Sequence, residues 1–548
     1  MFMKKRIVAV MLTVAMAASL LAGCGVPKQK NNSDSGKEST EKVFRYGTRT
    51  EPTTLDPTKA NCIPDSELQN SLIERLVRNV AGEIKPGCAK EWEISEDGLV
   101  YTFHLNEEAK WSDGEPITAE DFVYSWQRLM DPATAAQYAF IGGYIKNGNE
   151  IMNGKMAPTE LGVKAIDDVT LEVTLEHPTS YFLSLIGIQP QFAPLRKDIV
   201  EKYGKDFAAD ASKNVYSGPF VLVSSENQKW VFEPNENYWD RENIHLDRVE
   251  LSYIQNQETQ LAMYENGELD FTELPKVSVE KYKDQAESFK NGNTDYFYIN
   301  CNGENEALKN INFRLALNYG FDRNTYNQLA SEGIGAPSNV FAFRGLKGIE
   351  EGKTYGDESN LKSYPLDGDD AKAKEYLAKA EKELGKKAAD ISVEITTTDN
   401  DAAKKQAEVV QELWQKSLGI KVTINQVTYA EMLQRQSNGD YEIGWGGWVG
   451  DYDDPYTYLE LFKSDCPYNN SRYSNPKVDE LLNASQNETD AKKRQSLLAQ
   501  AEQIILDEGA VLPQAERENY YLIDEDVKGL ETYYVGVNYD WTYVDIEK

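Results

Sequence analysis

The sequence predicts an α/β protein built from two or three lobes, and three observations lead to this prediction. Strands alternate with helices along the C-terminal half of the chain. The stretch from 89 to 213 combines strands and helices in a different way. Residues 43–548 are also far more than the roughly 100 to 200 residues of a typical domain.

Residues 1–23 have the order of an export signal. Cations at positions 4–6 precede an apolar run of about 15 residues, shorter than the roughly 20 that a membrane-spanning helix needs. The run ends at Leu21-Ala22-Gly23-Cys24, which offers a small-residue cleavage site and resembles the bacterial lipobox, whose cysteine is acylated. We therefore expect lipid attachment at Cys24. The alternative is an ordinary secretory signal that happens to end at a cysteine.

Residues 24–42 predict a flexible tether. After the cysteine they carry one aliphatic side chain, Val26, among Lys, Asn, Ser, Gly and Glu. Such a segment cannot bury enough apolar surface to fold. Tether and lipid together would hold the chain at the extracytoplasmic face of a bacterial cell membrane without spanning it.

Composition and cysteine spacing exclude several classes of function. Lys and Arg number 58 against 90 Asp and Glu, a net charge of −32, which repels phosphate backbones and argues against a nucleic-acid partner. Cys62, Cys88, Cys301 and Cys466 stand in no CxxC or other metal-ligand spacing, so we expect no metal and no cofactor. Export permits disulfides, and a bridge between Cys62 and Cys88 stays open because pairing cannot be deduced from sequence.

The C-terminal half has the pattern of a largely parallel sheet with covering helices. Gly385 and Gly419 each stand where a glycine ends a helix, and apolar residues recur at period two in the strands. In order, the pattern predicts a helix at 371–384, a strand at 391–395, a helix at 402–418, a strand at 420–424, a short helix from Tyr429 and a strand at 441–445.

The stretch from 89 to 213 predicts a separate α+β lobe. Leu171 to Leu175 alternates like a strand. A helix is expected after Thr118, since a threonine followed three residues later by Asp121 satisfies the free N–H groups of a helix start.

The sequence lacks the motifs of the common enzyme classes. The chain has three histidines and no HExxH, GxSxG or P-loop motif. A glycosidase with two carboxylates is the remaining enzymatic interpretation, but 90 acidic residues produce such pairs by chance. We therefore expect a protein that is not an enzyme.

A glycine- and tryptophan-rich stretch, residues 444–450, follows the predicted strand at 441–445. Ligands of open α/β sheets bind beyond the carboxyl ends of strands. Glycines let a ligand approach the backbone, tryptophans form apolar walls, and Asp451 supplies a charge that suits an amine. The alternative is that residues 451–455 are only a turn and a helix start.

Several segments resemble one family, the bacterial extracellular solute-binding proteins of family 5, which include oligopeptide- and dipeptide-binding proteins. Residues 109–128 (AKWSDGEPITAEDFVYSWQR) match the family pattern KWSDGxPxTAxDFVxSWxR nearly throughout. Further matches, in the family's order, are Leu55-Asp56-Pro57, residues 162–168, Ser217-Gly218-Pro219-Phe220, Asn237-Tyr238-Trp239, residues 266–270, Arg314-Leu315-Ala316-Leu317, Asp322-Arg323 and residues 447–452.

The resemblance implies a type II periplasmic-binding-protein-like fold, in which two lobes and an extra α+β subdomain enclose a ligand cleft between the lobes. It implies a first lobe from 43–88, 214–300 and 517–548, an inserted subdomain at 89–213 and a second lobe at 301–516. It further implies a monomer that binds an extended peptide and delivers it to the permease subunits of an ABC importer.

Site residues follow from the matching positions. Asp451 would take the peptide α-ammonium, with Trp448, Gly447 and Val449 as neighbouring wall and backbone positions. The remaining lining positions implied by the resemblance are Trp445, Tyr138, Tyr296, Tyr429, Asn61, Cys62 and Ile63. Cations that hold a peptide carboxylate in some members are replaced here by Ser331, Ala403 and Trp445, and Arg517 is our candidate for a substitute.

Two alternatives on the same scaffold remain open from sequence. One is a receptor for a sugar, a nickel complex or another small solute, although Asp451 favours an amine-bearing ligand because a buried carboxylate needs a cationic partner. The other is a signalling or adhesion lipoprotein that no longer serves transport.

Overall fold

The computed structural model describes residues 41–80, 83–331, 334–466 and 468–547. The predicted export signal, nearly all of the tether and Cys24 therefore lie outside the described residues. Within the described ranges, no helix is both long enough and apolar enough to cross a membrane.

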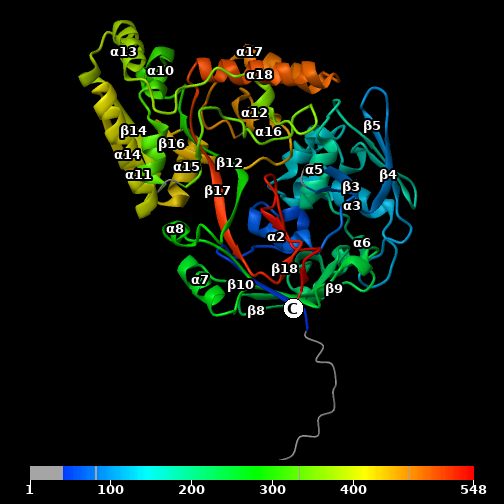
Figure 1. Ribbon diagram of the computed structural model, residues 1–548. Helices are drawn as coiled ribbons and strands as arrows, with labels where there is room; N and C mark the ends of the chain where they lie inside the picture. The colour runs from blue at the N-terminus through cyan, green and yellow to red at the C-terminus, as the bar shows by residue number, and fades with distance from the viewer. Residues whose placement is uncertain (1–40, 81–82, 332–333, 467, 548) are drawn as a thin grey trace, which may run out of the picture. The chain divides into compact units, whose positions relative to one another are not determined.

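An 11-stranded sheet runs through the protein (Figure 1). Across the sheet the strands follow the order β15 (Lys421–Val427), β14 (Ser392–Thr398), β16 (Ile443–Trp448), β12 (Glu287–Ile299), β17 (Val511–Ile523), β11 (Phe271–Glu273), β1 (Val43–Thr48), β10 (Arg248–Tyr253), β9 (Lys229–Pro234) and β8 (Phe220–Glu226), with β13 (Ala336–Pro337) paired to β17. Residues from both ends of the chain thus share one sheet.

The long antiparallel strands β12 and β17 join the two halves of this sheet. Their register slips between Lys290 and Thr294. On one side of the slip β17 pairs with β11, and on the other side β12 pairs with β16. Gly292 lies at the slip with φ 68°, and a Cβ there would stand 1.7 Å from the carbonyl oxygen of Tyr534. Only glycine fits this junction.

The C-terminal half has the parallel arrangement that the sequence predicts. Strand β14 pairs in parallel with both β15 and β16. Helices α13 (Asp370–Leu384) and α14 (Asp401–Leu418) end at Gly385 and Gly419, whose φ angles of 65° and 69° confirm the predicted helix ends. Trp414 of α14 is fully buried in the core of this half.

The last strand of that pattern differs from the prediction. We expected it at 441–445 with a glycine-rich loop beyond, but β16 spans Ile443–Trp448 and includes the glycines. The reason is close packing against β12. A Cβ on Gly444 would stand 2.2 Å from the ring of Tyr298, so glycine at this strand position makes room for a tyrosine.

The inserted segment forms the α+β unit that the sequence predicts. Its antiparallel sheet has the order β4 (Ala89–Ile94), β5 (Val100–Leu105), β7 (Thr170–Thr174) and β6 (Val163–Asp167). Helix α3 (Ala119–Met130) starts after Thr118, whose backbone N–H donates to Asp121 Oδ2 at 2.9 Å. Phe122 and Trp126 of α3 are fully buried.

The other elements complete the fold. The remaining helices are α2 (Ile63–Asn70), α4 (Gly148–Met152), α5 (Phe182–Ile188), α6 (Lys197–Tyr203), α7 (Gln257–Glu265), α8 (Val279–Tyr282), α9 (Glu306–Lys309), α10 (Ile311–Tyr319), α11 (Arg323–Ala330), α12 (Tyr355–Glu358), α15 (Tyr429–Asn438), α16 (Tyr456–Leu459), α17 (Pro476–Asn487) and α18 (Ala491–Asp507). Small two-stranded sheets pair β2 (Val77–Val80) with β3 (Glu83–Pro86), β18 (Val527–Lys528) with β21 (Asp545–Ile546) and β19 (Glu531–Thr532) with β20 (Tyr539–Asp540).

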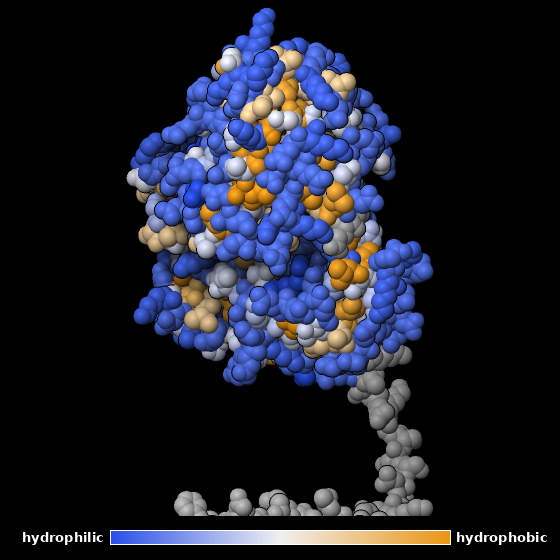
Figure 2. All heavy atoms as spheres, turned by 90° about the vertical axis from the view of Figure 1, so that its left-hand side faces the viewer, coloured by the Kyte–Doolittle hydropathy of each residue, from blue (hydrophilic) through white to orange (hydrophobic). Residues whose placement is uncertain are grey.

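Hydrophilic residues cover most of the face shown in Figure 2, with apolar side chains in scattered groups. The four described cysteines are all free, so the bridge between Cys62 and Cys88 that the sequence left open is not formed.

Candidate ligand-binding site

A cleft of about 530 Å³ lies where the two halves of the main sheet meet. Its walls come from both halves: α2, α7 and the ends of β1 and β11 on one side, and β12, β16 and the segment after α11 on the other. Strand β17 contributes residues 515–519 and Tyr521. The resemblance placed the ligand between the lobes, and the cleft is at the corresponding junction of the sheet.

Asp451 lies three residues beyond the end of β16, and its backbone is fixed on both sides. Its N–H donates to Thr457 Oγ1 at 3.1 Å, and its carbonyl accepts from Gln189 Nε2 at 2.9 Å. The side chain is 8% exposed. Within the described part of the chain, no side chain or backbone group hydrogen-bonds or ion-pairs with the carboxylate, and burial raises the pKa of Asp451 to about 7.

Aromatic side chains surround this carboxylate. The negative charge of Asp451 is the main cause of the raised pKa of Tyr138, with burial adding to it. Burial and then Asp451 raise the pKa of Tyr468 as well. Phe140 links these two tyrosines, with ring centroids 5.0 Å from Tyr138 and 5.5 Å from Tyr468, and Trp448 lies 6.0 Å from Tyr468. Asp451 is therefore a desolvated anion beside aromatic rings, an environment that suits an ammonium group.

Gly447 serves close packing within the protein. It pairs with Asp295 of β12, and a Cβ on it would stand 2.9 Å from both Asn293 Oδ1 and Asp295 Oδ1. The sequence suggested that the glycine admits a ligand to the backbone. The structure supplies a second reason, since the side chains of β12 occupy the space that a Cβ would need.

Trp445, Val449 and Ile63, three of the expected site residues, line the cleft. The indole Nε1 of Trp445 and Oδ1 of Asn293, which also lines the cleft, are buried and have no hydrogen-bond partner among the described residues. Unsatisfied buried donors and acceptors are costly, so a partner brought within reach of either atom would stabilise the site.

Other expected site residues lie elsewhere or are already engaged. Tyr296 is 5% exposed, packs edge-on against Phe341 at 4.8 Å and does not line the cleft. Asn61 is exposed and donates to Gln137 Oε1 at 2.7 Å. Cys62 precedes α2 as a free thiol whose pKa burial raises to about 11. Tyr429 begins α15, and its side chain lies outside the described part of the structure.

Arg517, the cation expected to hold a peptide carboxylate, is already paired with a carboxylate of the protein. Arg517 donates from Nε and Nη2 to the two oxygens of Asp295, at 3.1 and 2.8 Å, and its guanidinium lies 5.7 Å from the ring centre of Trp445. Ser331 lines the cleft, whereas Ala403 does not. A carboxylate that entered here would have to compete with Asp295 for Arg517.

Sequence reasoning missed the acidic residues of the site. Acidic side chains outnumber cations along the cleft: Glu67, Glu273, Asp295, Glu516 and Glu518 stand against Arg49, Lys276 and Arg517. It also missed Glu460, close enough to Asp451 that their charges interact. A sequence signal for Glu460 existed, since it is the one carboxylate in the otherwise apolar run Tyr458-Leu459-Glu460-Leu461-Phe462.

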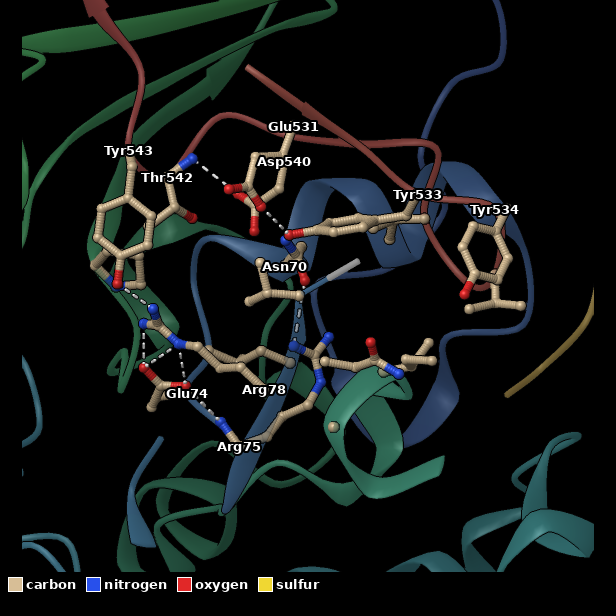
Figure 3. A pocket seen from close by; sticks show the side chains of 18 of the residues that line it. Asn70, Glu74, Arg75, Arg78, Glu531, Tyr533, Tyr534, Asp540, Thr542 and Tyr543 are labelled. Carbon is tan, nitrogen blue, oxygen red and sulfur yellow. Dashed lines mark hydrogen bonds and ion pairs between the residues drawn. The ribbon is translucent and has the colours of Figure 1, made fainter. Parts of the chain in front are cut away.

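A second cavity, shown in Figure 3, is too small for a peptide. Arg75 donates from Nη1 to Asn70 Oδ1 at 3.2 Å, while its buried Nη2 has no partner among the described residues. The cavity measures about 50 Å³. That space accommodates no more than a few water molecules, and the cleft remains the candidate site. The described residues also hold no group of His, Cys, Asp and Glu arranged to bind a metal ion.

Comparison with known proteins places the chain in one family. Residues 83–470 match the family described as bacterial extracellular solute-binding proteins, family 5 middle. The chain is 34% identical to the oligopeptide-binding protein OppA of Bacillus subtilis, an alignment that covers 96% of this chain and 97% of the relative. It is 32% identical to a probable deoxycholate-binding periplasmic protein of Escherichia coli, covering 86% of this chain and 88% of that protein.

Solved structures agree with the assignment. The structure of Listeria monocytogenes OppA bound to peptide superimposes with a TM-score of 0.78 at 33% identity, covering 93% of this chain and all of that one. The fold is therefore the two-lobed, type II binding-protein fold with an extra subdomain that the resemblance implied. Proteins of this kind bind solutes and are not enzymes. The chain belongs to the bacterial extracellular solute-binding proteins of family 5.

Proposed function

We propose that the protein is a lipid-anchored extracytoplasmic receptor that binds oligopeptides and delivers them to an ABC importer. The observation that carries the proposal is the buried carboxylate of Asp451, three residues beyond β16, which has no partner among the described residues. A carboxylate in such a place needs a cationic partner, and the α-ammonium of a peptide supplies one. The peptide-binding relatives support the same conclusion.

The rest of the cleft suits a peptide backbone. An extended peptide that starts at Asp451, which itself does not line the cleft, would run past Val449 and along the side of β16 that bears Trp445. Contacts to the backbone do not depend on side chains, so the receptor would accept many sequences.

The far end of the cleft favours peptides without a fixed C-terminus. Both arginines there are paired with carboxylates, Arg517 with Asp295 and Arg49 with Glu273 at 3.1 Å. A peptide carboxylate among the acidic residues of the cleft would be repelled. The C-terminus of a bound peptide would then extend towards solvent.

The transport role rests on the anchor and the lobes. Lipid at Cys24 would keep the receptor beside its permease, where ligand closes the lobes about the junction of β12 and β17. The expected lobe boundaries (43–88, 214–300 and 517–548 against 301–516, with 89–213 inserted) and a monomeric state belong to this proposal.

Mass spectrometry of ligands released from freshly purified protein tests the proposal. Peptides of mixed sequence with free N-termini are expected. Recovery of a sugar, a nickel complex or a steroid in place of peptides would refute it. The probable deoxycholate-binding relative makes a steroid the sharpest alternative, although the acidic cleft would repel an anionic bile acid.

A further inference from the structure

A side pocket of about 280 Å³ is lined by Glu460, whose carboxyl group is close enough to Asp451 for their charges to interact. Trp448, Phe140 and Tyr468 belong both to its wall and to the aromatic group around Asp451. The pocket also contains Tyr144, Tyr456, Leu461, His177, Glu460, Lys463, Asp465 and Cys466. Its wall therefore shares aromatic residues with the place where a peptide amine is expected.

Glu460 is the carboxyl group of this pocket that has no ion-pair partner among the described residues. Its carboxylate accepts hydrogen bonds from the hydroxyl groups of Tyr452 at 3.0 Å and Tyr144 at 3.4 Å. Burial raises the pKa of Glu460 to about 8, and the nearby charge of Asp451 adds to the increase. The attraction of Lys463 opposes this but is the smaller effect.

The other charges of the pocket do not replace a partner for Glu460. Lys463 faces the exposed Asp465 at 3.8 Å, which neutralises part of its charge. His177 contributes a carbonyl acceptor to Thr179 and lines the opening. Two carboxyl groups, Asp451 and Glu460, thus share one aromatic enclosure, and one peptide ammonium compensates only one of them.

We propose that this pocket receives the side chain of the first peptide residue and selects lysine or arginine there. The inference rests on the proposed function, because Asp451 fixes the amine and the first side chain branches from the adjacent carbon. The aliphatic stem would pack against Trp448 and Tyr468, and the cationic end would meet Glu460. An apolar first side chain would instead cover Glu460 without a partner, which is unfavourable.

Two peptides that differ only in the first residue, lysine or the isosteric norleucine, test the proposal by calorimetric titration at pH 8. The native protein is expected to bind the lysine peptide about tenfold or more tightly, the effect of one charge-assisted hydrogen bond. Glu460→Gln is expected to remove the difference while the norleucine peptide still binds. The control Glu480→Gln, the same change at an exposed carboxylate outside the pocket, is expected to keep it.

The outcomes separate this inference from the proposed function. If neither peptide binds the native protein, the peptide function itself fails. If both bind equally, or if Glu460→Gln keeps the preference, the pocket does not select a cation and the inference is overturned. Proton release on binding can be measured on the native protein alone. The lysine peptide should release more protons than the norleucine peptide, because its ammonium group favours the ionised form of Glu460. Equal proton release by the two peptides would contradict the proposal.

Discussion

Lowering the pH from 7 to 5 should weaken peptide binding strongly, because Asp451 must be ionised to hold an ammonium. With a pKa of about 7, the ionised fraction falls from about 50% at pH 7 to about 1% at pH 5. A peptide amine, with a pKa near 7.8, stays largely protonated over this range. The expected loss of affinity is about 40-fold, or about 2 kcal/mol.

The size of this loss of affinity distinguishes a buried carboxylate with a raised pKa from an ordinary one. An aspartate with the usual pKa of about 3.9 would remain ionised at pH 5, and affinity would hardly change. The groups whose charges interact with Asp451 do not titrate in this window. The charge of Asp451 keeps the pKa of Tyr138 above its usual range, burial does the same for Tyr458 and Tyr468, and Glu460, with a pKa of about 8, stays mainly protonated.

Isothermal titration at pH 5, 6 and 7 measures the dependence, with one peptide as a free amine and as its N-acetyl derivative. The free-amine peptide should lose affinity about tenfold between pH 6 and 5 and should release a proton on binding. The acetylated peptide, which has no ammonium, should not lose affinity as the pH falls. Affinity of the free-amine peptide that is constant within twofold would refute the assignment of a desolvated Asp451.

Three further predictions concern other parts of the chain. Gly292→Ala should lower the free energy of unfolding by about 1 to 3 kcal/mol, measured by chemical denaturation, because its Cβ meets a carbonyl oxygen at 1.7 Å. Gly267→Ala, with φ 74° and open space around it, measures the backbone strain alone, and an equal loss in both would contradict the clash. Cys24→Ala should release the protein from membranes into the soluble fraction, and its retention there would argue against the lipid anchor. Amidation of a peptide C-terminus should change affinity less than threefold; a tenfold loss would reveal a carboxylate clamp, and Arg517→Ala would then test its source.

Local sequence patterns predicted helices and strands, whereas contacts between residues far apart in the chain determine the geometry of the candidate site. The helices that end at Gly385 and Gly419 were readable because a glycine in the left-handed conformation is a local requirement. The pairing of Arg517 with Asp295 could not be predicted from the sequence, because the two residues are 222 positions apart in the chain. Sequence reasoning treated Arg517 as an available cation, whereas the fold brings an anion to it.

The same difference between local and long-range information explains what the sequence could and could not predict about Asp451 and Glu460. Asp451 was identified because it follows a strand and matches a family position. Its lack of an ion pair, and the interaction of its charge with Glu460, depend on how the segment from 451 to 462 folds against Tyr144 and Tyr138 from a distant part of the chain. No periodicity in the sequence reports such a contact.

Replacement of Asp451 by asparagine tests the central claim most directly. The variant keeps the size of the side chain and removes its charge, and the aspartate has no hydrogen bond from its carboxylate to lose within the described residues. At pH 7, Asp451→Asn should weaken a free-amine peptide about 10- to 150-fold, the worth of a charge-assisted contact, and leave the N-acetylated peptide nearly unchanged. An equal loss for both peptides, or no loss for either, would contradict the recognition of a peptide amine by Asp451.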